Sequence, residues 1–501
     1  RRVDRDEVFT LAQRQHQSGR VDEAEHLYRQ LLERDPNDDG ALHFLGVLYS
    51  QRKQYEPAIK LINKSLCLKP ANTQYQSNTA KISFEADRQT PPWRNSVRRA
   101  LDLDPFNSDA WVHSGAGNYA SLDFNQAFGA FSHAVVLNPA NSKSLHHRGK
   151  ALEQLGMFLS SEREFSRAVI AAPNAYEAMF GLAQINLRRL DLPSGWNWYE
   201  RRWQADSLFD GTPRPLYLRT SRPRVSSLSE CSGRRVLVWA EQGVGDELMF
   251  GTMLKEFGGY CGRLLVEVDR RLLPLYRRSF GSEVEWIERG AEVEESRYDL
   301  QIPVGSLGLH LRPSVESFAG HGGGYLVADR DRSERLRASL GVSAEERLVG
   351  LSWRSADPES GASRSLPLLE LIEALRGDGV RFVSLQYGSV GEEIEEVYRR
   401  SGVRVLECAE VDNFTDLDGL ASLLWGCDEV VTVGNATAHL AGSIGKRAHV
   451  LLPYVAGWRW MHEGDRSVWY DSLKLHRQTQ RDDWQGVREQ LSTVVSPLRY
   501  N

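Results

Sequence analysis

Over the first 200 positions, apolar residues recur with the spacing of amphipathic helices, and proline interrupts them at a fixed period. The interrupting prolines are Pro36, Pro70, Pro105, Pro139 and Pro173. They are 34, 35, 34 and 34 residues apart. A single helical hairpin cannot bury its apolar face alone, so this period predicts stacked hairpins that form an α superhelical array over residues 1–205.

Small residues stand at fixed offsets before these prolines, where two helices of a hairpin would pack closely. They are Ala24, Ala58 and Ala127 in one series and Gly46, Gly115 and Gly149 in the other. The period and these small residues together resemble the tetratricopeptide repeat. The third repeat departs from it, with Pro91 and Pro92 where a helix should begin and Trp93 in place of the small residue. Because proline is tolerated in a first helical turn, we expect a bent or shortened hairpin there.

After Pro173, the stretch around "SGWNWYERRWQ" predicts a final helix pair. Its Trp and Tyr side chains either cap the array or pack on the next domain. Residues 206–233 are rich in Pro, Ser and Gly and show no period, which is typical of a linker.

Beyond residue 233 short apolar runs alternate with helical patterns, which favours parallel sheets covered on both faces. The first series is "RRVLVWA", "RLLVEV", "VEWI" and "YDLQIPV"; the second is "RLVGLSW", "RFVSLQ", "RVLEC", "EVVTVG" and "AHVLLP". Two series predict two Rossmann-like α/β domains, 234–330 and 331–501. Parallel sheets bind ligands at the carboxyl ends of their strands, so function is sought in the loops that follow them.

Composition narrows the class of protein. Hydrophobic residues make up 41% and charged residues 26%, and no apolar run is long enough to span a bilayer. A net charge of -5 gives no general attraction for nucleic acid, and we interpret local basic clusters as solvated faces or linker. Five widely spaced cysteines without a CxxC pair suggest neither a disulfide framework nor a zinc site, and they favour the cytoplasm. Because the chain begins without Met, we expect a trimmed or partial chain.

The loop after the first strand of the second region, "EQGVGDELMF", opens a helix. Its residues Gln242, Gly243 and Gly245 would let backbone amides approach a substrate, and Asp246 follows them. The spacing differs from the dinucleotide fingerprint, so a nicotinamide cofactor is not expected. Asp246 is either a helix-capping acid or a general base that faces the cleft. If it only caps, Glu241 or Glu463 becomes the candidate base.

A matching strand, turn and helix occur in "VVTVGNATAHLAGSIGK". The turn carries four candidate phosphate-binding residues, Asn435, Thr437, Ala438 and His439. Arg354 and Arg364 would add positive charge for a departing phosphate. No DxD motif stands at a strand end, so we expect a reaction that needs no metal. Two turns of this kind, facing each other across a cleft, suit a nucleotide-activated substrate, and we expect no cofactor.

Together, "GDELMF", "RSLP", "SLQYG" and "NATAHLAGSIGK" resemble the bacterial heptosyltransferase group of inverting glycosyltransferases. Fusion to repeats, with the ending "GWRWMHEGDRSVWYDSLKLHRQ", resembles a branch of which some members glycosylate flagellin. The resemblance implies a GT-B fold, with 234–330 on the acceptor side and 331–501 on the nucleotide-sugar side. It implies that Asp246 is the base, that Arg364 faces the diphosphate, and that Gln386 and Glu392 lie at the nucleotide. Gly434 stands where that group usually has Asp.

Two functions follow as hypotheses. The first is a metal-independent glycosyltransferase of hexosyl, heptosyl or nonulosonyl type, whose repeats hold a protein acceptor such as flagellin on their concave surface. The second is a non-catalytic scaffold with a degenerate GT-B domain.

Overall fold

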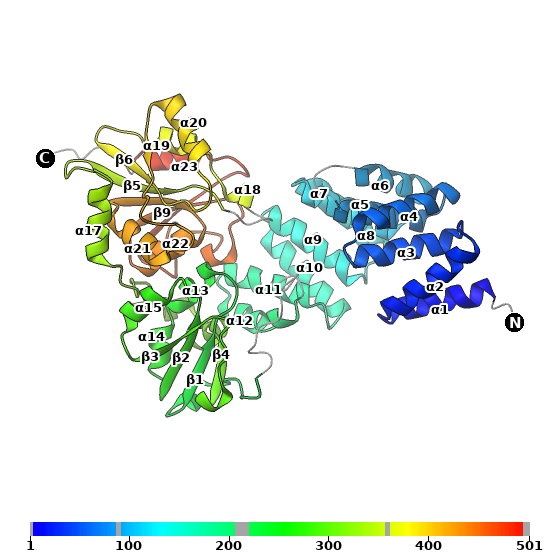
Figure 1. The fold of residues 1–501 in the computed structure, drawn as a ribbon, viewed down its shortest axis with the longest axis horizontal. Coiled ribbons are helices and arrows are strands. Elements are labelled where there is room, and N and C mark those ends of the chain that lie inside the picture. The colour runs from blue at the N-terminus through cyan, green and yellow to red at the C-terminus, as the bar shows by residue number, and fades with distance from the viewer. Residues whose placement is uncertain (1–3, 87–91, 206–219, 356–360, 494–501) are drawn as a thin grey trace. The chain divides into compact units, whose positions relative to one another are not determined.

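The computed structural model describes residues 4–86, 92–205, 220–355 and 361–493. Their contacts divide the chain into two compact units, Arg1–Gly181 and Leu182–Asn501 (Figure 1). This division comes earlier than the boundary expected at residue 205, because the last helical segment before that boundary packs within the second unit. A helical repeat array is therefore followed by an α/β region, as the sequence predicts.

The first unit consists of antiparallel helix pairs. Its helices are α1 (Arg5–Gln17), α2 (Val21–Arg34), α3 (Asp39–Gln51), α4 (Tyr55–Leu68), α5 (Thr73–Ala86), α6 (Pro92–Leu103), α7 (Ser108–Ala120), α8 (Phe124–Leu137), α9 (Ser142–Gln154), α10 (Phe158–Ala171) and the start of α11 (Tyr176–Arg188). The polar residue two positions after a repeat proline caps the next helix: Asp38, Asn107 and Asn141 accept from backbone amides of α3, α7 and α9. Each such cap stabilises a helix start by about 1 kcal/mol.

The predicted small positions do lie between closely packed helices. A Cβ added to Gly46 would lie 2.6 Å from Ile62, and one added to Gly115 would lie 2.5 Å from Phe131. A Cβ on Gly149 would lie 2.7 Å from Phe165. Larger side chains would force these helices apart, so the array depends on glycine here.

The third hairpin is shortened, as expected. Helix α6 begins at Pro92 and has 12 residues, against 14 in α4 and α8. Trp93 is 3% exposed and fills the space beside Gly117, where an added Cβ would lie 2.1 Å from its ring. Pro91 lies outside the described residues.

The segment after α11 packs into the second unit. It contains α12 (Leu192–Tyr199) and the 3-10 turn η1 (Arg202–Gln204). Trp196 Nε1 donates a hydrogen bond to the carbonyl oxygen of Arg312 at 2.8 Å, and the Trp196 ring meets Trp458 edge to face. Of the two roles expected for these aromatic residues, packing on the next domain is the one observed.

Residues 206–219, the first part of the expected linker, lie outside the described residues. The later part is packed and not free: Val225 N donates to Gln301 O at 3.0 Å, and the short turn η4 (Leu228–Cys231) follows. Apolar side chains at Val225 and Cys231 are buried, which explains why this part joins the domain.

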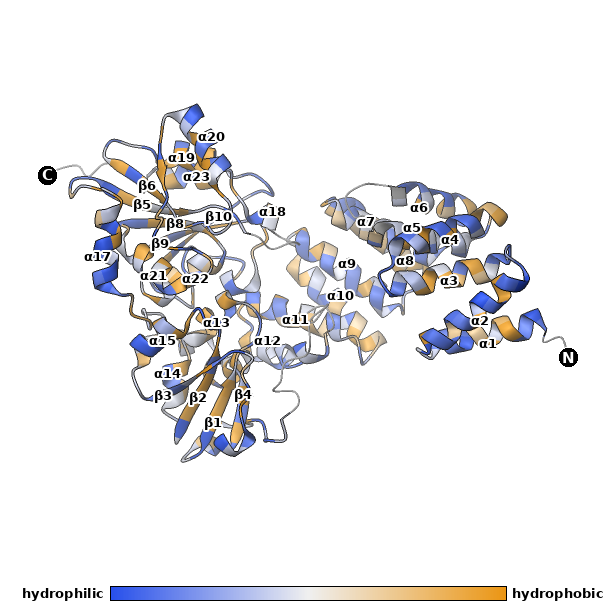
Figure 2. Ribbon diagram, in the orientation of Figure 1, coloured by the Kyte–Doolittle hydropathy of each residue, from blue (hydrophilic) through white to orange (hydrophobic). Residues whose placement is uncertain are grey.

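The first sheet has the order β3-β2-β1-β4, and all its pairings are parallel. Its strands are β1 (Arg235–Trp239), β2 (Arg263–Val268), β3 (Val284–Glu288) and β4 (Leu300–Pro303). Its helices are α13 (Val244–Gly251), α14 (Leu254–Gly258), α15 (Leu273–Phe280) and α16 (Leu307–Leu311), with turns η5 (Glu295–Arg297), η6 (Val304–Ser306) and η7 (Val315–Phe318). Figure 2 shows the strands as largely hydrophobic, which fits a sheet buried on both faces.

The second sheet is separate, with the order β10-β9-β8-β5-β6-β7 and only parallel pairings. Its strands are β5 (Arg347–Ser352), β6 (Val380–Ser384), β7 (Val405–Leu406), β8 (Glu429–Val433), β9 (Ala448–Leu452) and β10 (Leu473–Arg477). Its helices are α17 (Arg330–Ser339), α18 (Gly361–Arg364), α19 (Leu368–Leu375), α20 (Gly391–Ser401), α21 (Leu417–Gly426), α22 (Ala436–Ser443) and α23 (Gln485–Ser492), with the turn η8 (Trp458–Trp460). The apolar pattern missed β10, because "LKLHR" alternates with polar residues at this edge of the sheet.

Each sheet has a switch point where the strand order reverses. Strand β1 lies between β2 and β4, and β5 lies between β6 and β8. Loops after strands diverge at such points and leave a crevice for a ligand. The loops after β1, β5 and β8 are therefore the places to search.

Candidate active site

A cavity of about 500 Å³ lies where these loops meet. Its described lining residues come from both sheets: Gly243, Val244, Gly245, Asp246, Leu248, Arg271, Ser355, Arg364, Tyr387, Asn413, Phe414, Leu417, Leu420, Gly434, Asn435, Ala436, Thr437, His439, Leu440, Gly457, Arg459 and Trp460. The volume is in the range of small-molecule sites. Of the predicted site residues, Gly243, Gly245, Asp246, Arg364, Asn435, Thr437 and His439 are brought together here.

Gly245 allows α13 and α22 to approach each other across this cavity. A Cβ at Gly245 would lie 3.1 Å from His439 Cδ2 and 3.8 Å from the Ala436 Cα. The glycine thus brings the loop after β1 against the loop after β8. The loops that the sequence singled out separately belong to one site.

Asp246 does not cap α13. The N-cap residue is Gly243, and no side chain makes a capping hydrogen bond there. Asp246 Oδ1 instead accepts from Arg459 Nε at 2.5 Å, and Asp246 is 8% exposed. Its carboxylate therefore belongs to the cavity and not to the helix end.

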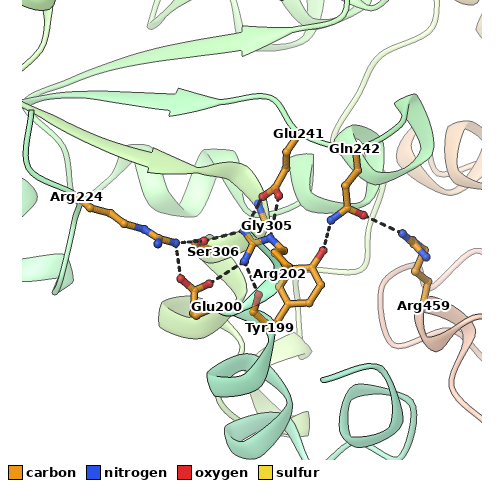
Figure 3. A network of polar contacts seen from close by, with 9 residues as sticks. All are labelled: Tyr199, Glu200, Arg202, Arg224, Glu241, Gln242, Gly305, Ser306 and Arg459. Carbon is orange, nitrogen blue, oxygen red and sulfur yellow. Dashed lines mark hydrogen bonds and ion pairs between the residues drawn. The ribbon is translucent and has the colours of Figure 1, made fainter. Parts of the chain in front are cut away.

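Gln242 holds the other side of Arg459. Its Oε1 accepts from Arg459 Nη2 at 3.2 Å, and its Nε2 donates to Tyr199 Oη at 2.5 Å (Figure 3). Its backbone has φ +59°, a left-handed conformation that is uncommon for a residue with a side chain. Strained backbone of this kind is often retained at functional sites.

The N-terminus of α22 is already capped. Asn435 Oδ1 accepts from the amides of Thr437 at 3.0 Å and Ala438 at 3.4 Å, and its Nδ2 donates to Ser352 Oγ at 2.9 Å. The sequence-based expectation was that these amides are open to a phosphate. These amides instead donate to the Asn435 side chain, which also donates to Ser352 at the end of β5.

His439 lines the cavity as a neutral side chain. It is 4% exposed, its Nδ1 lies 3.2 Å from Tyr470 Oη, and its ring stacks on Trp460 at 4.7 Å. Burial lowers the pKa of His439 to about 3. It therefore brings hydrogen-bonding and stacking capacity to the cavity, but no positive charge near neutral pH.

Trp460 also explains Gly434. A Cβ added to Gly434 would lie 2.9 Å from Trp460 Nε1 and 3.0 Å from Leu452 Cδ2. The indole occupies the space that an Asp side chain would need at this position. The glycine at residue 434 is thus matched by a tryptophan from the loop after β9.

Positive charge in the cavity comes from Arg271, Arg364 and Arg459. Arg271 is fixed by Asp269 at 2.8 Å and donates to Phe414 O at 3.1 Å. Arg354, which was expected to contribute, points elsewhere: it pairs with Glu393 at 2.8 Å and donates to Ser389 O at 2.6 Å. Among the described lining residues Asp246 is the carboxylate, so the lining carries more positive than negative charge.

Several predicted residues lie outside the lining. Gln386 is 3% exposed, and its Oε1 accepts from the amides of Trp353 and Arg354 at 3.0 Å each, so it orders the loop after β5. Glu392 lies exposed in the first turn of α20. The alternative base Glu241 is paired with the buried Arg202 at 2.8 Å, and the Glu463 side chain is 84% exposed.

Sequence reasoning missed Arg271, Tyr387, Phe414, Arg459 and Trp460. Each follows a strand of one of the two sheets. The rule that ligands bind at the carboxyl ends of parallel strands could have selected "GWRWM" and "DNFTD" as well as the loops that were chosen. No spacing in the sequence identifies the pairing of Arg459 with Asp246.

Within the described ranges, no group of three or more His, Cys, Asp or Glu residues is placed to hold a metal ion. No helix of the described residues has both the length and the apolar character needed to cross a membrane.

Comparison with known proteins supports the repeat assignment. Residues 15–82 and 147–201 match family models described as tetratricopeptide repeat. Protein FlbA of Caulobacter vibrioides is 28% identical over 474 residues, which is 90% of this chain and 77% of FlbA. The TPR protein TTC0263 of Thermus thermophilus is 14% identical and covers 40% of this chain and 99% of its own, with a TM-score of 0.33. The pilF protein of Pseudomonas aeruginosa is 16% identical over 42% of this chain and 93% of its own, with a TM-score of 0.35. The two matched stretches show that the chain carries tetratricopeptide repeats, a class of repeat that serves as a scaffold for protein interactions. Over most of its length the chain is similar to FlbA.

Proposed function

We propose that the chain is a glycosyltransferase of GT-B type that moves a sugar from a nucleotide-activated donor to a hydroxyl of a protein, with inversion and without metal. The observation that carries the proposal is one carboxylate, Asp246, in a cavity that three arginines also line. The cavity lies at the carboxyl ends of two parallel sheets, where nucleotides commonly bind in α/β folds. The order of the heptosyltransferase-like motifs along the chain supports the same reading.

Inverting transfer needs a base on the acceptor side and positive charge on the leaving-group side. Asp246, on the loop after β1, takes the proton of the attacking hydroxyl. Arg364, on the loop after β5, faces the departing phosphate, with Arg271 close to the same cavity. His439 cannot replace these arginines as a source of positive charge. Burial lowers its pKa to about 3, so the imidazole is neutral near pH 7.

Arg459 has two partners in this scheme. It pairs with Asp246 in the structure, and it lies in the lining with access to an anionic donor. When the donor phosphate binds, it shares the guanidinium with Asp246, so the carboxylate keeps its place while the cation's hold on it weakens and it can take the acceptor proton. This order, donor first and acceptor second, follows from one cation shared by two anions.

The repeat array is proposed to hold the acceptor. Tetratricopeptide repeats bind peptides and helices, and a protein acceptor would use such a surface whereas a small sugar acceptor would not. Flagellin is the candidate acceptor that the resemblance implies.

A second function, a scaffold that binds a nucleotide-sugar without turnover, is favoured by two observations. Asp246 is bound by Arg459, and Trp460 fills the position that an acidic side chain occupies in heptosyltransferases. If the donor does not weaken this ion pair, the cavity binds the nucleotide-sugar but does not react.

The experiment is a thermal-shift screen of nucleoside diphosphates and cytidine monophosphate, followed by hydrolysis of the matching nucleotide-sugars. We expect one nucleotide to stabilise the chain and its sugar derivative to release free nucleotide slowly. Binding without hydrolysis or transfer would favour the scaffold. No stabilisation by any of these nucleotides would contradict the glycosyltransferase.

A further inference from the structure

The helical segment before residue 206 contacts the loop that carries Asp246. Tyr199, the last residue of α12, is fully buried, and its Oη accepts from Gln242 Nε2 at 2.5 Å. Gln242 Oε1 accepts from Arg459, which in turn donates to Asp246. Figure 3 shows this series of side chains from Tyr199 through Gln242 to Arg459.

A buried ion pair fixes the residue next to Gln242. Arg202 is 0% exposed, and its Nε and Nη2 donate to the two oxygens of Glu241 at 2.9 and 2.8 Å. Glu241 Oε1 also accepts from the amide of Gly305 at 2.6 Å. The pair is fully satisfied, so it specifies one position for the loop after β1.

The strained backbone of Gln242 needs such support. Its left-handed φ of +59° is held by Tyr199 through the side chain and by Arg289 Nη1, which donates to Gln242 O at 2.7 Å. A conformation of this kind persists only where the surroundings over-determine it. If the contact with Tyr199 is lost, the Gln242 amide group turns and Arg459 loses Gln242 as an acceptor.

We infer that Tyr199 and Arg202 are positioning residues for the proposed reaction: through Gln242 and Arg459 they set where the Asp246 carboxylate lies. The inference rests on the proposed function for its catalytic part. It makes the segment 192–204 a component of the active site.

The test is Tyr199→Phe in the full chain, because this change removes one hydroxyl and keeps the ring that packs in the core. Tyr298→Phe is the matched control: Tyr298 is 1% exposed, and its Oη lies 2.8 Å from Thr220 Oγ1, away from the cavity. We expect Tyr199→Phe to lower kcat by roughly 10- to 100-fold, since small displacements of catalytic groups cost about that much, with donor KM unchanged. The control is expected to keep the kcat of the wild type.

Hydrogen exchange of the amides in residues 240–247 gives a readout that does not need turnover. We expect faster exchange in Tyr199→Phe than in Tyr298→Phe and the wild type, because the loop loses its hydrogen bond to the Tyr199 hydroxyl. Unchanged exchange would overturn the inference. Faster exchange with an unchanged kcat would also overturn it, and so would a loss of activity caused by a higher donor KM. A wild-type chain without turnover would contradict the proposed function, while the exchange comparison would still decide whether Tyr199 orders the loop.

A double variant separates positioning from general damage. If Tyr199 acts through Gln242, then Gln242→Ala and Tyr199→Phe together should cost little more than Gln242→Ala alone. Additive losses in kcat would mean that Tyr199 acts by another route and would overturn the pathway.

Discussion

Asp246 and Arg459 are 213 positions apart in the chain, yet Oδ1 of the one lies 2.5 Å from Nε of the other. Asp246 follows β1 and Arg459 follows β9, so the pair joins the loops of the two parallel sheets. In this structure the candidate base is bound by a cation that also faces the candidate donor site.

Replacing Arg459 with Ala should lower kcat by roughly 10- to 100-fold, because Asp246 loses the partner that orients it. Arg459→Lys keeps the charge but loses the planar fork whose Nε and Nη2 reach Asp246 and Gln242 separately. Its kcat should therefore lie between those of the alanine variant and the wild type. Steady-state transfer rates check this. A lysine variant that is no better than the alanine variant would show that charge at residue 459 is irrelevant.

Arg364 and Arg354 make a matched pair for the donor site. Arg364 lines the cavity, whereas Arg354 is paired with Glu393 outside it. We expect Arg364→Ala to weaken nucleotide affinity by roughly 1–3 kcal/mol, the range for a lost charge-assisted hydrogen bond, and Arg354→Ala to leave it nearly unchanged. Calorimetry with the nucleotide found by the screen measures both. Equal effects would reject the assignment of Arg364.

Gly434 should not tolerate a methyl group. Its added Cβ would approach Trp460 Nε1 to 2.9 Å, whereas a Cβ on Gly457 would meet nothing within 4 Å. We expect Gly434→Ala to lower the free energy of unfolding by roughly 1–3 kcal/mol, as over-packing does, and Gly457→Ala to change it little. Urea denaturation of the two variants compares them directly. Similar stability of the two would mean that Trp460 moves aside easily.

Stability should fall on acidification through His439. Burial lowers its pKa to about 3 in the folded chain, whereas the unfolded chain takes up the proton near pH 6.5. Between these values the unfolded state binds more protons, so the free energy of unfolding falls by up to about 1.4 kcal/mol per pH unit as pH decreases.

His439→Gln should make the decline between pH 6.5 and 4 shallower, and the exposed His26→Gln serves as the control. Denaturation curves at several pH values check this. The same slope in His439→Gln and the wild type would contradict a neutral, buried imidazole.

The sequence was sufficient for features that depend on neighbours along the chain. The spacing of the prolines predicts where the repeats lie. The small residues Gly46, Gly115 and Gly149 predict where two helices pack closely. Apolar runs predict every strand except β10, because each run is a local feature of the sequence.

Features set by distant contacts could not be predicted in the same way. The boundary between the units lies after Gly181 and not at residue 205. The reason is that Trp196 and Tyr199 form hydrogen bonds with residues more than forty positions later in the chain, Arg312 and Gln242. Asn435 was expected to leave its helix amides open, and only the structure shows that its side chain turns back to cap them. Arg354 and Arg364 look alike in the sequence, and their different neighbours alone decide which one faces the cavity.

The most direct test of the account is transfer of sugar to an acceptor protein, followed by intact mass, for the wild type and Asp246→Asn. Asn keeps the size of the side chain but cannot take the acceptor proton, so we expect transfer to fall by roughly 10²- to 10⁴-fold with donor affinity little changed. Asp428→Asn is the control, because Asp428 pairs with Arg337 outside the lining. Equal transfer rates for Asp246→Asn and the wild type would contradict the assignment of Asp246 as the base.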